Sequence, residues 1–118
     1  MNRSTYRTAI LILGLFTALV HLILLNVLLV GAGYGISVPF ILNGLGYFVF
    51  LWVFFRRPSF LIGRRTLLHL AFMGYTAVTI VAWFLMGDLS DPIGIITKLA
   101  EVLLIVVLYL NLRAGARA

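Results

Sequence analysis

Four long apolar runs dominate this sequence and leave few folds open to it. The runs cover about residues 8–30, 37–55, 66–86 and 93–112. A helix that crosses a bilayer needs about 20 predominantly apolar residues, and each run has roughly that length. Of the 118 residues, 64% are hydrophobic and 10% are charged, whereas soluble domains contain about 25% charged residues. The sequence therefore predicts one all-α domain, a polytopic membrane protein with four transmembrane helices in an up-down-up-down bundle.

Capping residues mark the starts of two of these helices. Ser37 with Pro39 precedes the second run, and Asp91 with Pro92 precedes the fourth. A serine or aspartate side chain can accept an unpaired backbone N–H of the first helical turn, where proline needs no donor. We therefore expect helices to begin close to Ser37 and Asp91.

The basic residues fall on one side of the predicted spans. The chain has nine Lys and Arg residues against three Asp and Glu residues, a formal net charge of +6. Every arginine lies near a terminus or in the central loop 56–65, whereas the opposite loops hold Asp88 and Asp91. Because cytoplasmic loops carry the excess of Lys and Arg, we expect the central loop and both termini (N-in and C-in) in the cytoplasm. The expected location is the cytoplasmic membrane of a prokaryote.

The arginines of the central loop admit two interpretations. They can serve only to set the topology, or they can also bind anionic lipid heads or an acidic partner. The residues concerned are Arg56, Arg57, Arg64 and Arg65. The lipid bilayer, including its anionic lipid heads, is thus an expected partner. Nucleic acid is not, because the arginines bracket apolar runs and form no patch on a folded surface.

The last apolar run contains the only lysine and the only glutamate, Lys98 and Glu101. A charge at bilayer depth costs roughly 2.5–3.5 kcal/mol on insertion scales and needs a partner. Residues at i and i+3 of a helix can pair locally. At about 1.5 Å rise per residue, His21 shares the level of Glu101, with Asn43 and Thr79 slightly further outward. We predict a candidate intramembrane polar site of His21, Asn43, Thr79, Lys98 and Glu101.

A regular period of 100° per residue assigns faces to these helices. In the last run one arc of about 120° holds Gly94, Thr97, Lys98, Glu101, Ile105 and Tyr109. The third run presents a stripe of His69, Phe72, Thr76, Thr79 and Trp83. Asn26 points about 140° away from His21 at this period, so we expect it to serve a different contact.

Two interpretations of the polar site stay open at this level. Asn, Thr and His side chains in membrane helices commonly hydrogen-bond across helices, worth about 0.6 kcal/mol on average, and a Lys–Glu pair can simply offset its own burial. Ionisable residues within a membrane more often mark a functional site. The sequence does not decide between a packing role and a functional one.

Several chemistries find no support in the sequence. There is no cysteine, which excludes disulfides and thiolate metal sites, and no His, Asp and Glu set has metal-ligand spacing. A bis-His haem would need His21 and His69 at one level, whereas their levels differ by more than about 10 Å by helix rise. No catalytic set is present, so we expect no enzyme, no metal and no cofactor. Binding of a quinone, haem or pigment between the helices stays open as an alternative, which rests on His21, Tyr47, Tyr75 and Trp83.

The first run contains His21, and the other three contain the segments ISVPFILNGLGYF, YTAVTIVAWF and KLAEVLLIVVL. In these features the sequence resembles a family of small uncharacterised four-helix integral membrane proteins common in haloarchaea. The resemblance covers most of the chain. The family often has an acid–Lys…Gln arrangement in the fourth helix, where this chain has Thr97, Lys98 and Glu101. The resemblance implies the four-helix membrane fold and no particular activity.

The function favoured by the sequence is that of a small integral membrane protein without enzymatic activity, an accessory or structural subunit of a larger membrane complex. Self-association or other membrane subunits would be its partners. The alternative is a homo-oligomeric transporter or channel, coupled to ions or protons, in which Glu101 titrates or binds a cation and Lys98 tethers it. Four helices in a tight bundle enclose side chains and no pore, so such a pathway would need more than one copy.

Overall fold

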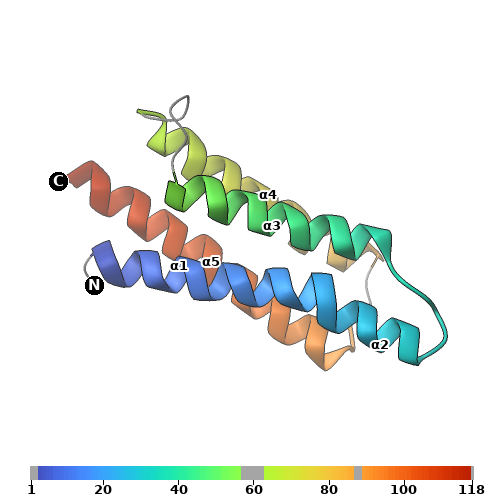
Figure 1. Cartoon of the computed structure of the whole chain (residues 1–118). Coiled ribbons are helices and arrows are strands. Elements are labelled where there is room, and N and C mark those ends of the chain that lie inside the picture. The colour runs from blue at the N-terminus through green and yellow to red at the C-terminus, as the bar shows by residue number, and fades with distance from the viewer. Residues whose placement is uncertain (1–2, 57–62, 87–88, 118) are drawn as a thin grey trace.

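The computed structural model describes residues 3–56, 63–86 and 89–117, and every secondary-structure element within these residues is helical (Figure 1). The first apolar run forms α1, a π-helical turn η1 and α2, which follow one another without a break. The elements are α1 (Arg3–Leu19), η1 (Val20–Leu24), α2 (Leu25–Gly31), α3 (Val38–Arg56), α4 (Arg65–Met86) and α5 (Pro92–Arg117).

Four helices are long and apolar enough to cross a membrane. These stretches are Ser4–Gly31, Val38–Arg56, Arg65–Leu85 and Pro92–Ala114. They overlap the four runs expected from the sequence, although α5 continues beyond residue 112 to Arg117. Of the predicted loop 56–65, residues 57–62 lie outside the described part of the chain.

The helices pack side by side in an elongated bundle with extents of 51 × 27 × 23 Å. α1 lies against α5 on one side and α3 on the other, and α4 lies against α5. α3 and α4 meet through aromatic rings, with Tyr47 and Tyr75 centroids 4.9 Å apart and Phe50 and Phe72 centroids 5.2 Å apart. The N- and C-termini lie at the same end of the bundle (Figure 1).

Both expected helix caps are present. The backbone N–H of Phe40 donates to Ser37 Oγ at 3.3 Å, and the N–H of Ile93 donates to Asp91 Oδ1 at 3.1 Å. Each bond pairs one of the N–H groups that a helix start leaves without an intrahelical acceptor. The predicted starts of α3 and α5 are therefore confirmed.

The buried face of α5 departs beyond Glu101 from the arc expected from the sequence. Leu104 and Leu108 are fully buried, whereas Tyr109 is 46% exposed, so the buried face leaves the arc that ends at Tyr109. The buried positions advance in alternate steps of four and three residues, the repeat of helices that pack nearly parallel. Beyond Glu101 the arc expected from the sequence continued at Ile105 and Tyr109, each four residues after the last. Steps of four alone turn away from the face that contacts the other helices. On α4 the predicted stripe is confirmed, since His69, Phe72 and Thr76 are all 0% exposed.

The π-helical turn changes the faces of the first span. At a regular period Asn26 would point away from His21, but the turn accommodates one more residue and rotates the helix after it by roughly 100°. Both side chains are therefore buried, at 7% and 4% exposure. Asn26 Nδ2 donates to the His21 carbonyl at 3.1 Å and to the Leu22 carbonyl at 3.2 Å, and Asn26 Oδ1 accepts the Ser37 N–H at 2.6 Å. Asn26 thus bonds to backbone groups and to Ser37, and not to the His21 ring, as expected, although the π-helical turn brings it to the buried side of the helix.

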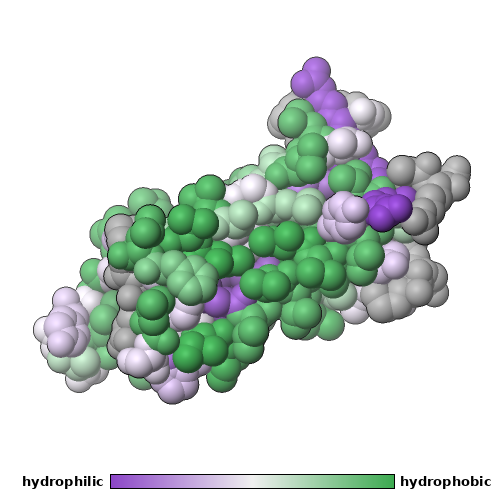
Figure 2. Space-filling view, turned by 180° about the vertical axis from the view of Figure 1, so that it is seen from behind, coloured by the Kyte–Doolittle hydropathy of each residue, from purple (hydrophilic) through white to green (hydrophobic). Residues whose placement is uncertain are grey.

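The outer surface of the bundle is apolar. Large side chains are exposed on all four spans, for example Val27 at 62%, Trp52 at 57%, Leu85 at 79% and Leu99 at 60%. In Figure 2 apolar side chains cover most of the visible face and surround a small hydrophilic area near its middle. Monomeric soluble proteins rarely expose an apolar area of this kind, whereas lipid would cover it without cost.

Candidate functional site

The centre of the bundle is occupied by the carboxylate of Glu101, which is 0% exposed. Lys98, one turn earlier on α5, places its Nζ 2.8 Å from Oε2 and 3.0 Å from Oε1. The Lys98 side chain is 10% exposed. The predicted local pair is therefore present, and the two charges neutralise each other within the bundle, as a buried charge requires.

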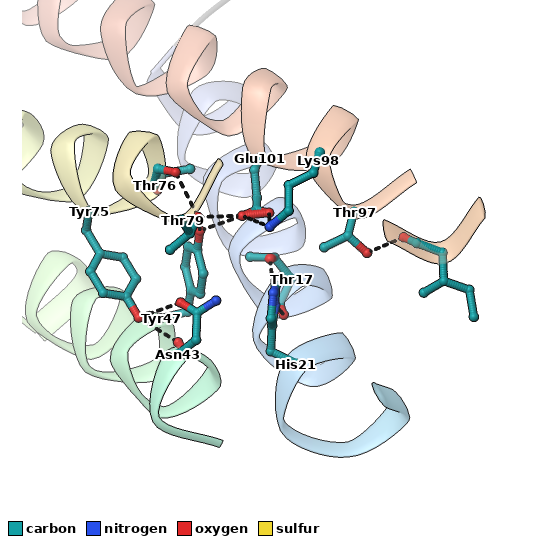
Figure 3. A network of polar contacts seen from close by, with 11 residues as sticks. Thr17, His21, Asn43, Tyr47, Tyr75, Thr76, Thr79, Thr97, Lys98 and Glu101 are labelled. Atoms are coloured by element: carbon teal, nitrogen blue, oxygen red, sulfur yellow. Dashed lines mark hydrogen bonds and ion pairs between the residues drawn. The ribbon is translucent and has the colours of Figure 1, made fainter. Parts of the chain in front are cut away.

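Two hydroxyl groups from other helices complete the surroundings of this carboxylate (Figure 3). Tyr47 Oη of α3 lies 3.0 Å from Glu101 Oε1, and Thr79 Oγ1 of α4 lies 2.6 Å from the same oxygen. The two hydroxyls are 2.9 Å apart, and Thr79 Oγ1 is also 2.8 Å from the Thr76 carbonyl. Each hydroxyl has one proton and can donate to only one of these acceptors at a time. The carboxylate thus ties three helices together.

His21 lies beside this cluster and does not hydrogen-bond to it within the described residues. Its Nδ1 is 2.8 Å from the Thr17 carbonyl, and because a carbonyl only accepts, Nδ1 bears a proton. The ring stacks on Tyr47 with centroids 6.3 Å apart and meets Phe40 edge-on at 5.9 Å. In the neutral ring Nε2 is then an acceptor, and it makes no hydrogen bond to the described residues. His21 is therefore linked to Glu101 through Tyr47, which its ring contacts and which donates to the carboxylate.

Asn43 does not join the central cluster. Tyr75 Oη lies 2.7 Å from the Asn43 carbonyl and 2.8 Å from Asn43 Oδ1, so this contact ties α3 to α4 further along the bundle. Figure 3 shows the Tyr75–Asn43 pair as separate from the contacts of Glu101. Of the five residues expected in one site, Thr79, Lys98 and Glu101 share direct contacts, His21 lies adjacent, and Asn43 lies apart.

The residue that sequence reasoning missed is Tyr47, which is 0% exposed and bonds to Glu101. Tyr47 shares a face with Asn43 and lies one turn deeper. Helical side chains lean toward the N-terminus of their helix, which for α3 directs Tyr47 back toward the level of Glu101. The length and lean of the side chain could have identified it.

The arginines of the predicted lipid-contact set differ from one another. Arg56 and Arg64 are exposed at the end of the bundle that holds the termini, and Arg57 lies outside the described residues. The guanidinium of Arg65 turns inward and donates to the backbone carbonyls of Asn111 and Leu112 of α5. Arg65 therefore links α4 to α5 and is not simply a surface charge.

His69 forms a second buried polar contact near this end. Its Nδ1 lies 2.8 Å from the Arg65 carbonyl, and Asn111 Nδ2 lies 2.9 Å from its Nε2. With a carbonyl acceptor on one side and an amide donor on the other, the ring has the neutral Nδ1–H form. His21 and His69 thus lie on separate elements and contact separate partners.

The described residues contain no group of three or more His, Asp and Glu side chains that could hold a metal ion. The surface has a groove of about 490 Å³ at the end with the termini, and another of about 390 Å³ beside Asn26. Lys98 and Glu101 line neither groove. Chemically, the centre is a neutralised ion pair held by two hydroxyl donors, with an imidazole acceptor close by.

The fold and this centre define a class, that of small all-α proteins whose four long apolar helices enclose a buried ion pair. The chain belongs to the family of unknown function DUF7475, whose model matches residues 2–111. No curated protein and no solved structure matches the chain.

Proposed function

We propose that this protein is a non-enzymatic integral membrane protein of a prokaryotic cytoplasmic membrane and acts as an accessory or structural subunit of a larger membrane complex. Its four spans would run up-down-up-down with both termini in the cytoplasm. The arginine distribution supports this orientation, because Arg7, Arg56 and Arg113 belong to helix ends near the termini, while Asp91 begins α5 at the other end.

The observation that carries a structural role is the saturation of Glu101 by its own chain. Its oxygens receive Lys98 Nζ, Tyr47 Oη and Thr79 Oγ1. A carboxylate with three donors and an internal counter-charge needs neither substrate nor partner to be stable in a low-dielectric interior. Such a group fixes which helix faces meet, and this is what a subunit that presents a defined outer surface requires.

The exposed face of α4 supports a contact with another membrane subunit. Ala71, Gly74, Val78 and Val81 lie on one side of the helix, and all are exposed. A Cβ added at Gly74 would meet nothing within 4 Å of its own chain. Without a hydrophobic driving force between helices in lipid, association depends on close approach at small residues. This face of α4 is the proposed partner contact.

The proposal is tested by the native mass of the protein after mild extraction from its source membrane, with mass spectrometry of the band. The wild type should migrate in a mixed complex. Gly74→Leu should release the chain as a smaller species, because the larger side chain prevents close approach of the partner. Val49→Leu on α3, at a site that is 59% exposed, is the control and should stay in the complex. A wild-type chain that migrates alone contradicts the subunit role.

A second candidate is a homo-oligomeric transporter or channel coupled to ions or protons. The observation in its favour is His21, whose Nε2 acceptor makes no bond within the described residues and whose ring stacks on Tyr47, a donor to Glu101. A homo-oligomer without other subunits would favour this role. Glu101→Gln would then abolish coupled flux in proteoliposomes, and unchanged flux would exclude Glu101 as the titrating group.

A further inference from the structure

A groove of about 490 Å³ lies between the first turns of α1 and the end of α3. The side chains that line it are Ser4, Arg7, Thr8, Leu11 and Phe55. Four of these side chains belong to α1 and Phe55 belongs to α3, so the groove is an open one between two helices. From the sequence this end of the chain was expected to contact lipid heads through the central loop, and neither Arg7 nor Phe55 was part of that expectation.

The groove contains a positive charge without a protein counter-charge. The Arg7 guanidinium lies over the ring of Phe55 at 5.0 Å from its centroid, which fixes its position by a cation–π contact. No carboxylate of the described residues contacts it. The chain has three acidic residues, of which Glu101 is paired with Lys98, Asp91 begins α5 at the opposite end, and Asp88 lies outside the described residues. Among the described residues no carboxylate neutralises the Arg7 guanidinium, which leaves it open to an anion such as a lipid phosphate.

The polar and apolar walls of the groove follow one another along α1. The hydroxyls of Ser4 and Thr8 flank Arg7 at the end of the bundle, and Leu11, which is 39% exposed, lies one turn further toward its centre. One turn corresponds to about 6 Å along the helix. A phospholipid has its charged phosphate at the bilayer surface and its acyl chains further in. The groove has the matching order, with a positive charge and hydroxyl donors at the end of the bundle and apolar side chains further in. Arginine also matches a phosphate with two parallel hydrogen bonds.

We infer that this groove binds one anionic phospholipid, with its phosphate on Arg7, Ser4 and Thr8 and the start of an acyl chain against Leu11 and Phe55. The lipid would occupy the leaflet on the side of the termini. The site is distinct from the central ion pair and does not depend on a subunit role for the protein. It requires only that the four spans lie in a bilayer.

The test uses the full chain in mild detergent, titrated with dioleoyl phosphatidylglycerol or dioleoyl phosphatidylcholine, and counts bound lipid by native mass spectrometry. The wild type should bind one phosphatidylglycerol about tenfold more tightly than phosphatidylcholine, the scale of one charge-assisted contact. Arg7→Gln should remove this preference. Arg113→Gln, which deletes an exposed arginine that lies over the Tyr109 ring at the same end but outside the groove, is the matched control and should retain it.

A second variant separates the groove from the charge. Thr8→Trp keeps Arg7 and fills the hollow, so it should lose the tight phosphatidylglycerol while it unfolds at the wild-type temperature. The inference is overturned if Arg7→Gln keeps the preference, or if Arg113→Gln loses it equally, which would indicate diffuse charge. It is also overturned if Thr8→Trp binds phosphatidylglycerol as the wild type does.

Discussion

Removal of Lys98 while Glu101 stays in place is the sharpest test of the central ion pair. Glu101 is 0% exposed and has no contact with solvent. Lys98→Met keeps the length and apolar stem of the side chain but leaves the carboxylate with only the two hydroxyls of Tyr47 and Thr79. Breaking a buried pair at one partner costs about 3–5 kcal/mol. Because two donors remain, we expect the lower end, about 3 kcal/mol of unfolding free energy.

The converse substitution should cost less. Glu101→Gln retains an oxygen that can accept from Tyr47 or Thr79, and the Lys98 side chain that it strands is 10% exposed and can move its head toward polar surroundings. We expect a loss of about 1.5 kcal/mol, the scale of one hydrogen bond to a charged group. The double variant, with Lys98→Met and Glu101→Gln together, removes both charges and should also lower the unfolding free energy by about 1.5 kcal/mol. If the effects of the two single substitutions were additive, the double variant would lose about 4.5 kcal/mol, so the expected coupling energy between the two side chains is about 3 kcal/mol.

The measurement is a titration of the refolded protein with sodium dodecyl sulfate in mixed micelles, followed by the fluorescence of Trp52 and Trp83. Leu99→Met, at a neighbouring position that is 60% exposed, is the control and should stay within about 0.5 kcal/mol of the wild type. A Lys98→Met protein as stable as the wild type would refute the reasoning. A double variant with the full additive loss would show that the two side chains stabilise the bundle independently.

Two further substitutions probe the contacts around this centre in the same titration. Tyr47→Phe removes one donor to Glu101 and keeps the ring packing, so it should lower the unfolding free energy by about 1–2 kcal/mol. A loss as large as that of Lys98→Met would contradict the expectation that Lys98 stabilises the carboxylate more than the Tyr47 hydroxyl does. Gly44→Ala should cost about 1–3 kcal/mol, because its Cβ would lie 2.8 Å from the Ala18 carbonyl of α1. Gly74→Ala, where the Cβ meets nothing, is the control and should be nearly neutral.

The helices, their starts and the ion pair were predictable because each depends on local information. Run length and composition identify a span, Ser37 and Asp91 cap the next residues along the chain, and Lys98 reaches Glu101 on its own helix. None of these features requires knowledge of which helices are neighbours. The same holds for the stripe on α4, whose positions follow from one helix with a regular period.

The partners of Glu101 on other helices depend on packing that the sequence does not specify. Depth by helix rise puts Glu101 at about 12 Å from the outer end, between Asn43 at about 9 Å and Tyr47 at about 15 Å. That spacing does not select between the two. The choice is made by side-chain lean and length, and by Tyr75, whose hydroxyl lies 2.7 Å from the Asn43 carbonyl and 2.8 Å from Asn43 Oδ1 and so holds Asn43 in a contact with α4. A polar residue at the right depth is therefore not yet a member of a site.

The π-helical turn shows the same limit within one helix, and it bears on how His21 is placed. Gly44 of α3 leaves room for the backbone of this region to approach, since a Cβ there would lie 2.9 Å from the Leu22 nitrogen. Asn26 Nδ2 donates to the carbonyls of His21 and Leu22, which a π-helical turn leaves without regular α-helical partners. A glycine on one helix and an amide on the other thus stabilise the same irregular turn. That turn holds His21 next to Tyr47, which donates to Glu101. His21 is therefore positioned beside the buried carboxylate by Gly44 and Asn26, which have no contact with Glu101 themselves.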